Sequence, residues 1–264
     1  MPLFAPLNPP LPAWPDARVW IVGASTGIGA ETAKLMLARG ARVALSARSA
    51  EKLSSVAGDA LAAGRAIVEP LDFTDASAVD AAWTRIVAAW GSVDLVLIVA
   101  GTHEEMRAWE LTGARARALL ETNLHAVIGT VAAVVPTLLA QKQGAIGIVA
   151  SVAGYGGLPK ALIYGASKAA LINFTETLYL DLHGRGLGVY LVNPGFVRTP
   201  LTARNDFPMP HLIDADRAAQ EIVAGLERGE FEIHFPKAFS RKLKLLRLLP
   251  YRWYFAAIRR STGL

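Results

Sequence analysis

The 264-residue chain contains no cysteine, and its five histidines are scattered without the H-E-x-x-H or similar spacing that holds a metal ion. The missing thiols exclude disulfides, thiol catalysis and cysteine-ligated metals. We therefore expect no metal site, and the absence of cysteine fits a cytoplasmic protein.

Long hydrophobic runs are also missing. The most apolar stretch, residues 126–140, is shorter than the roughly 18–20 residues that cross a bilayer, and it contains Pro136. The N-terminus has neither the basic start nor the apolar centre of a signal peptide. Its six prolines between Pro2 and Pro15 instead predict an extended arm over residues 1–16.

Acidic residues are absent from residue 237 onward, where eight lysines and arginines occur. Because the whole chain has a formal net charge of +5, the first 236 residues together carry about −3. The basic character therefore belongs to the tail, and we expect no nucleic-acid partner for the main body.

The rest of the chain alternates apolar runs with helical patterns, and 53% of all residues are hydrophobic. The runs are continuous, as in parallel strands that helices cover on both faces. This predicts an α/β fold, a doubly wound (Rossmann) parallel sheet of about seven strands with helices on both faces, in one domain over residues 17–236. The expected strands are residues 18–23, 42–48, 65–72, 93–101, 144–151, 186–195 and 231–236. The expected helices are residues 30–39, 51–63, 76–90, 112–141, 163–183 and 215–227.

A glycine-rich turn joins the first expected strand to the first helix, with Gly23, Gly27 and Gly29 in the stretch GASTGIG. A tight turn of this kind presents backbone N–H groups and a helix N-terminus to an anion. Glycine lets the backbone turn sharply and approach a pyrophosphate closely. On these residues alone, an ordinary packing turn remains the alternative.

Four polar residues further along the chain are candidate catalytic residues. Tyr164 and Lys168 are four residues apart in YGASK, Ser151 precedes the tyrosine by thirteen residues, and Asn123 lies in TNLHA. Each alone has an ordinary structural explanation. Together with the glycine turn and NPGFVRT (193–199), they follow the order and spacing of the short-chain dehydrogenase/reductase family, which the chain resembles over about residues 19–199.

The residue types suit proton transfer. Tyr164 and Lys168 share one helix face, and a lysine cation favours the phenolate, which lowers the tyrosine pKa from about 10. Tyr164 is then expected to exchange a proton with a carbonyl or alcohol oxygen, while Ser151 hydrogen-bonds the same oxygen. The resemblance further implies that Lys168 binds the nicotinamide ribose and that Asn123 supports a proton path through water.

The residues at the end of the second expected strand are expected to determine whether the protein binds NAD or NADP(H). There Ala47 takes about the place of an acidic residue that would bind ribose hydroxyls, and Arg48 follows. The arginine fork suits a 2′-phosphate, so we predict NADP(H) in preference to NAD; a merely solvated arginine is the alternative. The resemblance implies cofactor contacts from Gly23, Ser25, Thr26, Gly27, Ile28, Gly29, Arg48, Asp72, Phe73, Ala100, Gly101, Tyr164, Lys168, Pro194, Gly195, Val197 and Thr199.

The chain departs from the family pattern at the end of the fourth strand. The family usually has N-N-A-G there, whereas this chain has I-V-A-G at Ile98–Gly101. Two polar side chains that would tie the sheet together are therefore apolar. The departure affects local hydrogen bonding and cofactor affinity, but it removes no proton-transfer residue.

Two segments are expected to line the substrate pocket. One lies between Ser151 and Tyr164 and contributes Val152, Tyr155 and Leu158. The other, residues 201–214, contributes Phe207, Met209 and Leu212 as an apolar lid, unless it is a surface loop packed for its own stability. These residues predict a small apolar ketone, aldehyde or alcohol as substrate. Two other functions stay open, a nucleotide-binding or redox-sensing protein with little turnover and an NAD-dependent alcohol dehydrogenase.

The basic amphipathic extension, residues 237–264, has two interpretations. On a helical wheel Phe239, Leu243, Leu246 and Leu249 share one side, and Arg241, Lys244 and Arg247 share the other. The extension either lies on an anionic lipid surface or packs on its own domain or a second copy.

The expected helix around residues 126–139 is apolar nearly all round, which is typical of a doubly buried helix or an oligomer interface. The family resemblance implies a homodimer or homotetramer formed through this helix and the helix that carries Tyr164.

Overall fold

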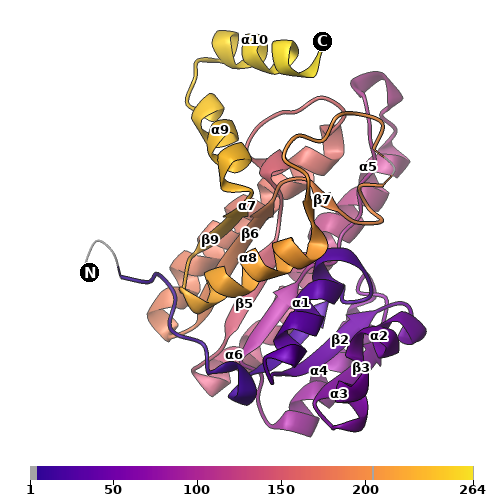
Figure 1. The fold of residues 1–264 in the computed structure, drawn as a ribbon, viewed down its shortest axis with the longest axis vertical. Helices are drawn as coiled ribbons and strands as arrows, with labels where there is room; N and C mark the ends of the chain where they lie inside the picture. The colour runs from indigo at the N-terminus through magenta and orange to yellow at the C-terminus, as the bar shows by residue number, and fades with distance from the viewer. Residues whose placement is uncertain (1–4, 204, 264) are drawn as a thin grey trace.

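The computed structural model describes residues 5–203 and 205–263, and within them seven strands form one parallel sheet (Figure 1). The strand order β3-β2-β1-β4-β5-β6-β9 reverses direction between β1 and β4, where a doubly wound sheet opens a crevice at the carboxyl ends of its strands. The strands are β1 (Arg18–Val22), β2 (Arg42–Ala47), β3 (Ala66–Pro70), β4 (Leu95–Ile98), β5 (Ala145–Val149), β6 (Gly188–Pro194) and β9 (Glu232–Phe235). The predicted fold class and the seventh strand are thereby confirmed.

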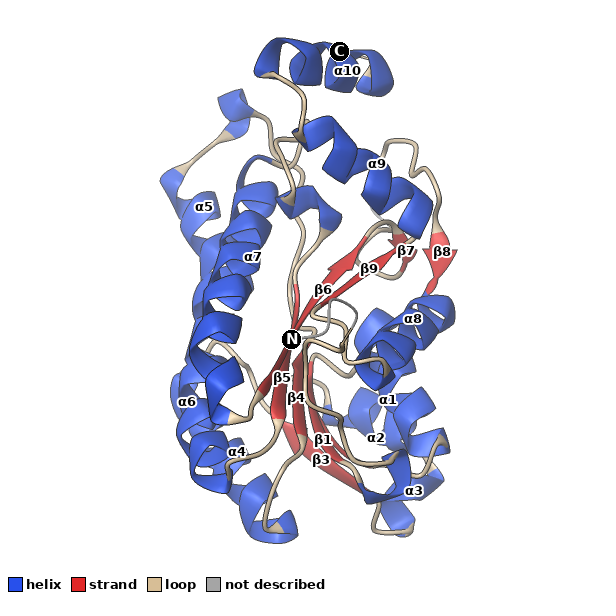
Figure 2. Cartoon of the chain, turned by 90° about the vertical axis from the view of Figure 1, so that its left-hand side faces the viewer, coloured by secondary structure: helices blue, strands red, loops and turns tan. Residues whose placement is uncertain are grey.

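Helices cover both faces of the sheet (Figure 2). On one face lie α1 (Gly27–Ala38), α2 (Ala50–Ala57), α3 (Asp59–Ala62) and α8 (Ala215–Glu227). On the other lie α4 (Ala76–Trp90), α5 (Gly113–Leu120), α6 (Ala126–Gln141) and α7 (Leu162–Leu182). A short pair of strands, β7 (Val197–Arg198) and β8 (Ile213–Asp214), follows the end of β6.

The continuous apolar runs result from this layering. Along β1, Val19 and Ile21 belong to the core on the α1 side, whereas Trp20 and Val22 belong to the core on the α4 side. Trp20 stacks on Trp83 of α4 with ring centroids 5.5 Å apart. A strand buried on both faces has no solvent side and therefore no need for alternating polar residues.

Three expected helices are interrupted. The helix expected at residues 51–63 breaks at Gly58, which has φ +50° and separates α2 from α3. The helix expected at residues 112–141 contains a π-helical turn at Glu121–His125 between α5 and α6. The extension forms two helices, α9 (Lys237–Arg247) and α10 (Tyr251–Thr262), because Pro250 cannot continue α9.

The proline-rich arm lies against the domain where the structure describes it. Asn8 is buried, and its amide donates to the Val189 carbonyl over 2.9 Å while its oxygen accepts from Val189 N over 2.8 Å. Trp14 begins a 3₁₀ turn, Trp14–Asp16, and its indole donates to Glu227 Oε1 over 2.6 Å. The division into arm, domain and extension stays a prediction, since these contacts join the arm to the domain.

One helical segment of the described chain, Gly113–Gln141, is long and apolar enough to cross a membrane by length and composition alone. The sequence predicted no spanning segment, because its most apolar stretch, residues 126–140, is shorter than a span. In the fold this segment is α5, the π turn and α6, and its side chains Val127, Val131 and Leu138 belong to the core beneath the sheet. In this fold the segment therefore covers one face of the sheet.

Candidate active site

A pocket of about 90 Å³ opens at the carboxyl ends of the strands, where the order of the sheet reverses. It brings together residues from the turn after β1, the ends of β4, β5 and β6, and helix α7. Its lining is Ile28, Val99, Gly101, Thr102, Val149, Ala150, Ser151, Tyr164, Lys168, Pro194, Gly195, Val197, Thr199, Leu201 and Thr202. Nine of these were predicted as catalytic or cofactor-binding residues.

The glycine turn, residues 23–29, forms a concave stretch of backbone that we call the glycine cradle. Side chains in place of Gly23 or Gly29 would clash with the surrounding backbone. Gly23 has φ +97°, and a Cβ there would lie 2.5 Å from the Ala100 amide nitrogen. A Cβ on Gly29 would lie 2.1 Å from the Gly23 carbonyl oxygen. Helix α1 begins immediately after Thr26, whose side chain makes no capping bond. The first amides of α1 are therefore turned to the site, as an anionic pyrophosphate requires.

Tyr164 and Lys168 lie on one face of α7 and meet at the pocket. The Lys168 ammonium is 5.8 Å from the centroid of the Tyr164 ring and donates to the Val149 carbonyl over 2.9 Å. Burial lowers the pKa of Lys168 to about 8. Burial also raises the pKa of Tyr164, against a smaller lowering by the Ser151 hydroxyl. The pKa of Tyr164 therefore shifts in the direction opposite to the predicted lowering, because desolvation disfavours the phenolate.

Ser151 and Asn123 hold the surrounding backbone. The Ser151 hydroxyl accepts from Ala153 N over 3.1 Å and donates to the Pro194 carbonyl over 3.4 Å, which joins the ends of β5 and β6. Asn123, fully buried in the π turn, donates to the Thr102 carbonyl over 2.8 Å and accepts from Thr102 N over 2.7 Å. Both residues therefore fix loops that surround the pocket.

The family model for short chain dehydrogenases matches residues 17–207, which contain the whole of this site. The chain belongs to the short chain dehydrogenase family. It is 37% identical over 243 residues to an uncharacterised oxidoreductase of Myxococcus xanthus, covering 91% of this chain and 95% of the relative.

Two solved structures of the family are also similar. A short chain dehydrogenase of Burkholderia cenocepacia in complex with NADP is 26% identical, with a TM-score of 0.80 over 92% of this chain and 97% of that chain. The actinorhodin polyketide ketoreductase, solved with NADPH, is 25% identical, with a TM-score of 0.74 over 84% of this chain and 96% of that one. The chain is therefore an NAD(P)-dependent dehydrogenase or reductase by family.

The other residues expected to contact the cofactor surround this short chain dehydrogenase pocket. Arg48 is exposed directly after β2, and its charge adds to a lowering of the Asp72 pKa that comes mainly from the Thr74 backbone N–H. Phe73 packs on the core at the end of β3. Ser25 and Thr26 lie in the glycine turn, and a Cβ on Gly27 would lie 2.9 Å from Thr199 Cγ2.

The departure at Ile98–Gly101 changes side chains but keeps the backbone contacts. Ile98 is buried in β4, and the amides of Val99 and Ala100 both donate to the Val22 carbonyl, over 2.8 and 2.9 Å. The two apolar side chains extend the core toward the pocket. The Thr102–Asn123 pair supplies polar ties just beyond them.

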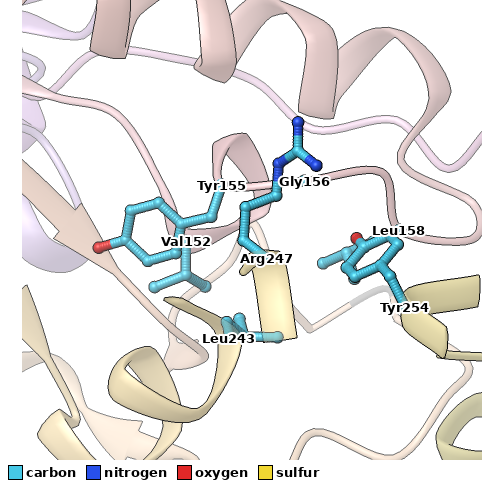
Figure 3. A pocket seen from close by; sticks show the side chains of 7 residues that line it. All are labelled: Val152, Tyr155, Gly156, Leu158, Leu243, Arg247 and Tyr254. Atoms are coloured by element: carbon cyan, nitrogen blue, oxygen red, sulfur yellow. The ribbon is translucent and has the colours of Figure 1, made fainter. Parts of the chain in front are cut away.

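The residues predicted for the substrate pocket divide into two groups. Val152, Tyr155 and Leu158 line a narrow second pocket of about 10 Å³ whose other wall is the extension (Figure 3). That wall consists of Leu243 and Arg247 of α9 and Tyr254 of α10. The extension therefore belongs to the surroundings of the site, which the helical wheel did not predict for Arg247.

The remaining three predicted residues lie in the segment between β7 and β8 and line neither pocket. The Phe207 ring packs edge-on against Phe196 at 5.8 Å, and the Lys160 ammonium lies 5.5 Å from its centroid. Lys160 also pairs with Glu105 over 2.9 Å and with Asp206. Met209 accepts a bond from Asn205, and Leu212 precedes β8. The segment is held to Lys160 in the loop between β5 and α7, and its role as a lid stays a prediction.

Several residues of the site were not predicted from the sequence. His103 packs edge-on against the Tyr164 ring with centroids 4.6 Å apart, and burial lowers its pKa. Thr102 also lines the pocket, together with Leu201 and Thr202 from the start of the segment that was expected as a lid. Thr102 and His103 lie one and two residues beyond the predicted site residue Gly101, and this position next to a strand end is the signal that was available.

Proposed function

We propose that this protein is an NADP(H)-dependent oxidoreductase that interconverts an apolar ketone or aldehyde with its alcohol. The observation that carries the proposal is that Tyr164, Lys168 and Ser151 line one pocket with the ends of β4, β5 and β6 and the start of α1. The glycine cradle and the uncapped start of α1 fit the pyrophosphate of a dinucleotide. Such a cofactor, when bound, supplies or accepts a hydride.

The roles of the side chains follow from their surroundings. Tyr164 donates its phenolic proton to the carbonyl oxygen as the carbon gains a hydride, and the alcohol leaves with both. Ser151 donates a hydrogen bond to the same oxygen and stabilises its developing charge. Lys168 keeps a positive charge beside the phenolate that remains and hydrogen-bonds the cofactor ribose. The Tyr164 phenol, whose pKa burial raises, is protonated at neutral pH and can therefore act as the proton donor in carbonyl reduction.

Arg48 is proposed to select NADP(H) through the 2′-phosphate. Its guanidinium is exposed after β2, and no carboxylate stands at Ala47 to repel the phosphate. Hydrogen bonds to a charged group contribute about 1.5–3 kcal/mol, so Arg48→Ala should weaken NADPH binding by about 10- to 150-fold and leave NADH binding unchanged. Titration of nicotinamide fluorescence with both cofactors measures this.

Arg42→Ala is the matched control, because Arg42 is an exposed arginine at the opposite end of β2. It should leave both affinities as they are. If the unaltered protein prefers NADH, the NADP assignment is wrong. If it binds neither cofactor, the enzyme assignment gives way to that of a protein with little turnover.

We also infer a homo-oligomer formed through α6 and α7. Along the outer side of α6, Ile128, Ala132 and Pro136 are exposed and apolar, which is unusual for a face that remains in water. Ile128→Arg with Ala132→Arg should convert the assembly to monomers in light scattering after size exclusion. Ala38→Arg on α1, also exposed but on the opposite face of the sheet, should not. A monomeric unaltered protein would contradict the inference.

A further inference from the structure

The extension exposes an unusual number of large apolar side chains. Of the thirteen that are exposed among the described residues, five lie in α9, α10 or their connection. Leu248 is 80% exposed and Trp253 is 63% exposed. The other three are Leu245, Tyr251 and Phe255. Figure 1 shows both helices beyond the carboxyl end of the sheet, with α10 outermost.

Basic side chains lie among these apolar ones. Arg241 and Lys242 of α9 and Arg252, Arg259 and Arg260 of α10 are exposed. Residues 237–264 include no aspartate or glutamate to neutralise them. On α10 the arginines occupy the side opposite the buried Tyr254 and Ile258, and aromatic residues flank them. We call this outer side of α9 and α10 the basic-aromatic face.

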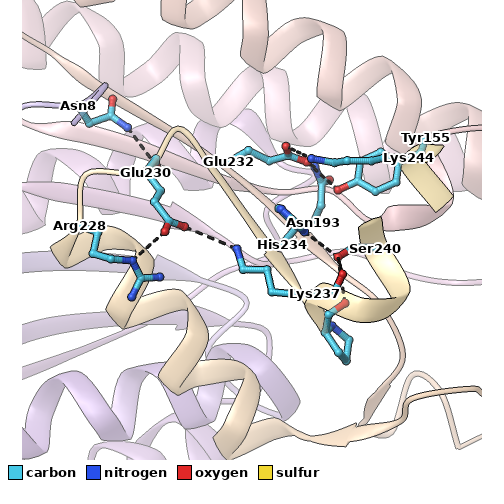
Figure 4. Close-up of polar contacts among 11 residues, drawn as sticks. Asn8, Tyr155, Asn193, Arg228, Glu230, Glu232, His234, Lys237, Ser240 and Lys244 are labelled. Carbon is cyan, nitrogen blue, oxygen red and sulfur yellow. Dashed lines mark hydrogen bonds and ion pairs between the residues drawn. The ribbon is translucent and has the colours of Figure 1, made fainter. Parts of the chain in front are cut away.

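The inner side of the same helices is fastened to the domain (Figure 4). Glu232 of β9 accepts from the Tyr155 hydroxyl over 2.6 Å and from Asn193 over 2.9 Å, and it pairs with Lys244 of α9. The Tyr254 hydroxyl of α10 donates to the Gly157 carbonyl over 2.8 Å. These partly buried contacts fix which side faces outward, so the apolar residues of the basic-aromatic face cannot turn inward without breaking them.

We propose that the basic-aromatic face binds an anionic lipid bilayer. Arginines between aromatic and leucine side chains suit the headgroup region, where guanidinium groups meet lipid phosphates and aromatic rings lie at the interface. A second copy that met this face symmetrically would bring two sets of unneutralised arginines together, which disfavours self-association there. The proposal concerns binding alone and is independent of the proposed function.

Co-sedimentation with vesicles tests the proposal on the full chain. Vesicles of equal parts phosphatidylglycerol and phosphatidylcholine should bind the protein, and vesicles of phosphatidylcholine alone should bind it far more weakly. Because each basic residue near an anionic surface contributes about a factor of five, the triple variant Arg252→Glu, Arg259→Glu and Arg260→Glu should lose about a hundredfold in affinity. Leu248→Ser with Phe255→Ser should also bind more weakly.

Matched controls lie outside the extension. Lys52→Glu, Lys142→Glu and Arg185→Glu alter the net charge equally, and Leu7→Ser with Leu61→Ser removes two other exposed leucines. Both control variants should bind like the unaltered protein. Equal loss in the charge control would show attraction to net charge alone and overturn the face assignment. Failure of the unaltered protein to sediment with anionic vesicles, or its association into larger species through this face, would overturn lipid binding.

Discussion

Replacing Tyr164 by phenylalanine is expected to reduce carbonyl reduction by about 10²- to 10⁴-fold, the usual contribution of a positioned general acid. The change removes only the hydroxyl that delivers the proton. The ring remains to pack against His103 at 4.6 Å and beside Lys168. NADPH affinity should therefore change little. The rate of NADPH oxidation, with the ketone or aldehyde that the unaltered protein reduces fastest, measures the loss.

Tyr179→Phe provides the comparison on the same helix. Tyr179 lies four turns further along α7, outside the pocket, where its hydroxyl donates to the Leu7 carbonyl over 3.0 Å. Loss of that hydroxyl should leave turnover unchanged. Retention of a tenth or more of the activity in the Tyr164 variant would mean that another group delivers the proton, and the neighbouring His103 would be examined next.

Replacing Lys168 by methionine is expected to abolish most activity and to change how stability depends on pH. The pKa of Lys168 is about 8 in the folded protein and about 10.4 in an unfolded chain. Between these values the unfolded chain binds the proton more strongly, so the lysine makes the free energy of unfolding rise with pH there. The slope reaches at most about 1.4 kcal/mol per pH unit.

Urea unfolding at several pH values without nucleotide measures this difference. The free energy of unfolding of the unaltered protein minus that of the Lys168→Met variant should increase from pH 8 to pH 10. Below pH 8 the difference should be level, because both states are then protonated. Lys142→Met, a change at an exposed lysine at the far end of the molecule, should give a level difference throughout. If the difference for the Lys168→Met variant also stays constant with pH, the Lys168 amine is not desolvated in the folded protein.

The fold could be predicted because its signals are local. The run of residues 19–22 is apolar throughout because Val19 and Trp20 enter different cores, and that pattern distinguishes a strand covered on both faces from a strand with one face in water. The interruptions were harder to predict. The π turn at Glu121–His125 contains Asn123, whose two bonds to Thr102 come from a segment twenty-one residues away. No periodicity within the helix reports such a contact.

The features of the site likewise divide into those that local sequence patterns predict and those that depend on contacts between distant segments. Tyr164 and Lys168 were predicted from their spacing, because residues four apart on a helix share a face, and Ser151 was predicted from the order and spacing of the family motifs. The direction of the Tyr164 pKa was not, since it depends on burial among residues of several strands. The orientation of α9 could not be predicted either. The wheel grouped Lys244 with Arg241, whereas in the structure Lys244 pairs with Glu232 of β9 and Arg241 is exposed.

The second pocket has one wall from residues 152–158 and the other from Leu243, Arg247 and Tyr254. During synthesis the chain is made from its N-terminus, so the glycine cradle at Gly23 and the proton-transfer residues are complete long before Tyr254 is added. The second pocket therefore lacks one wall until α9 and α10 have been synthesised and have packed against residues 152–158.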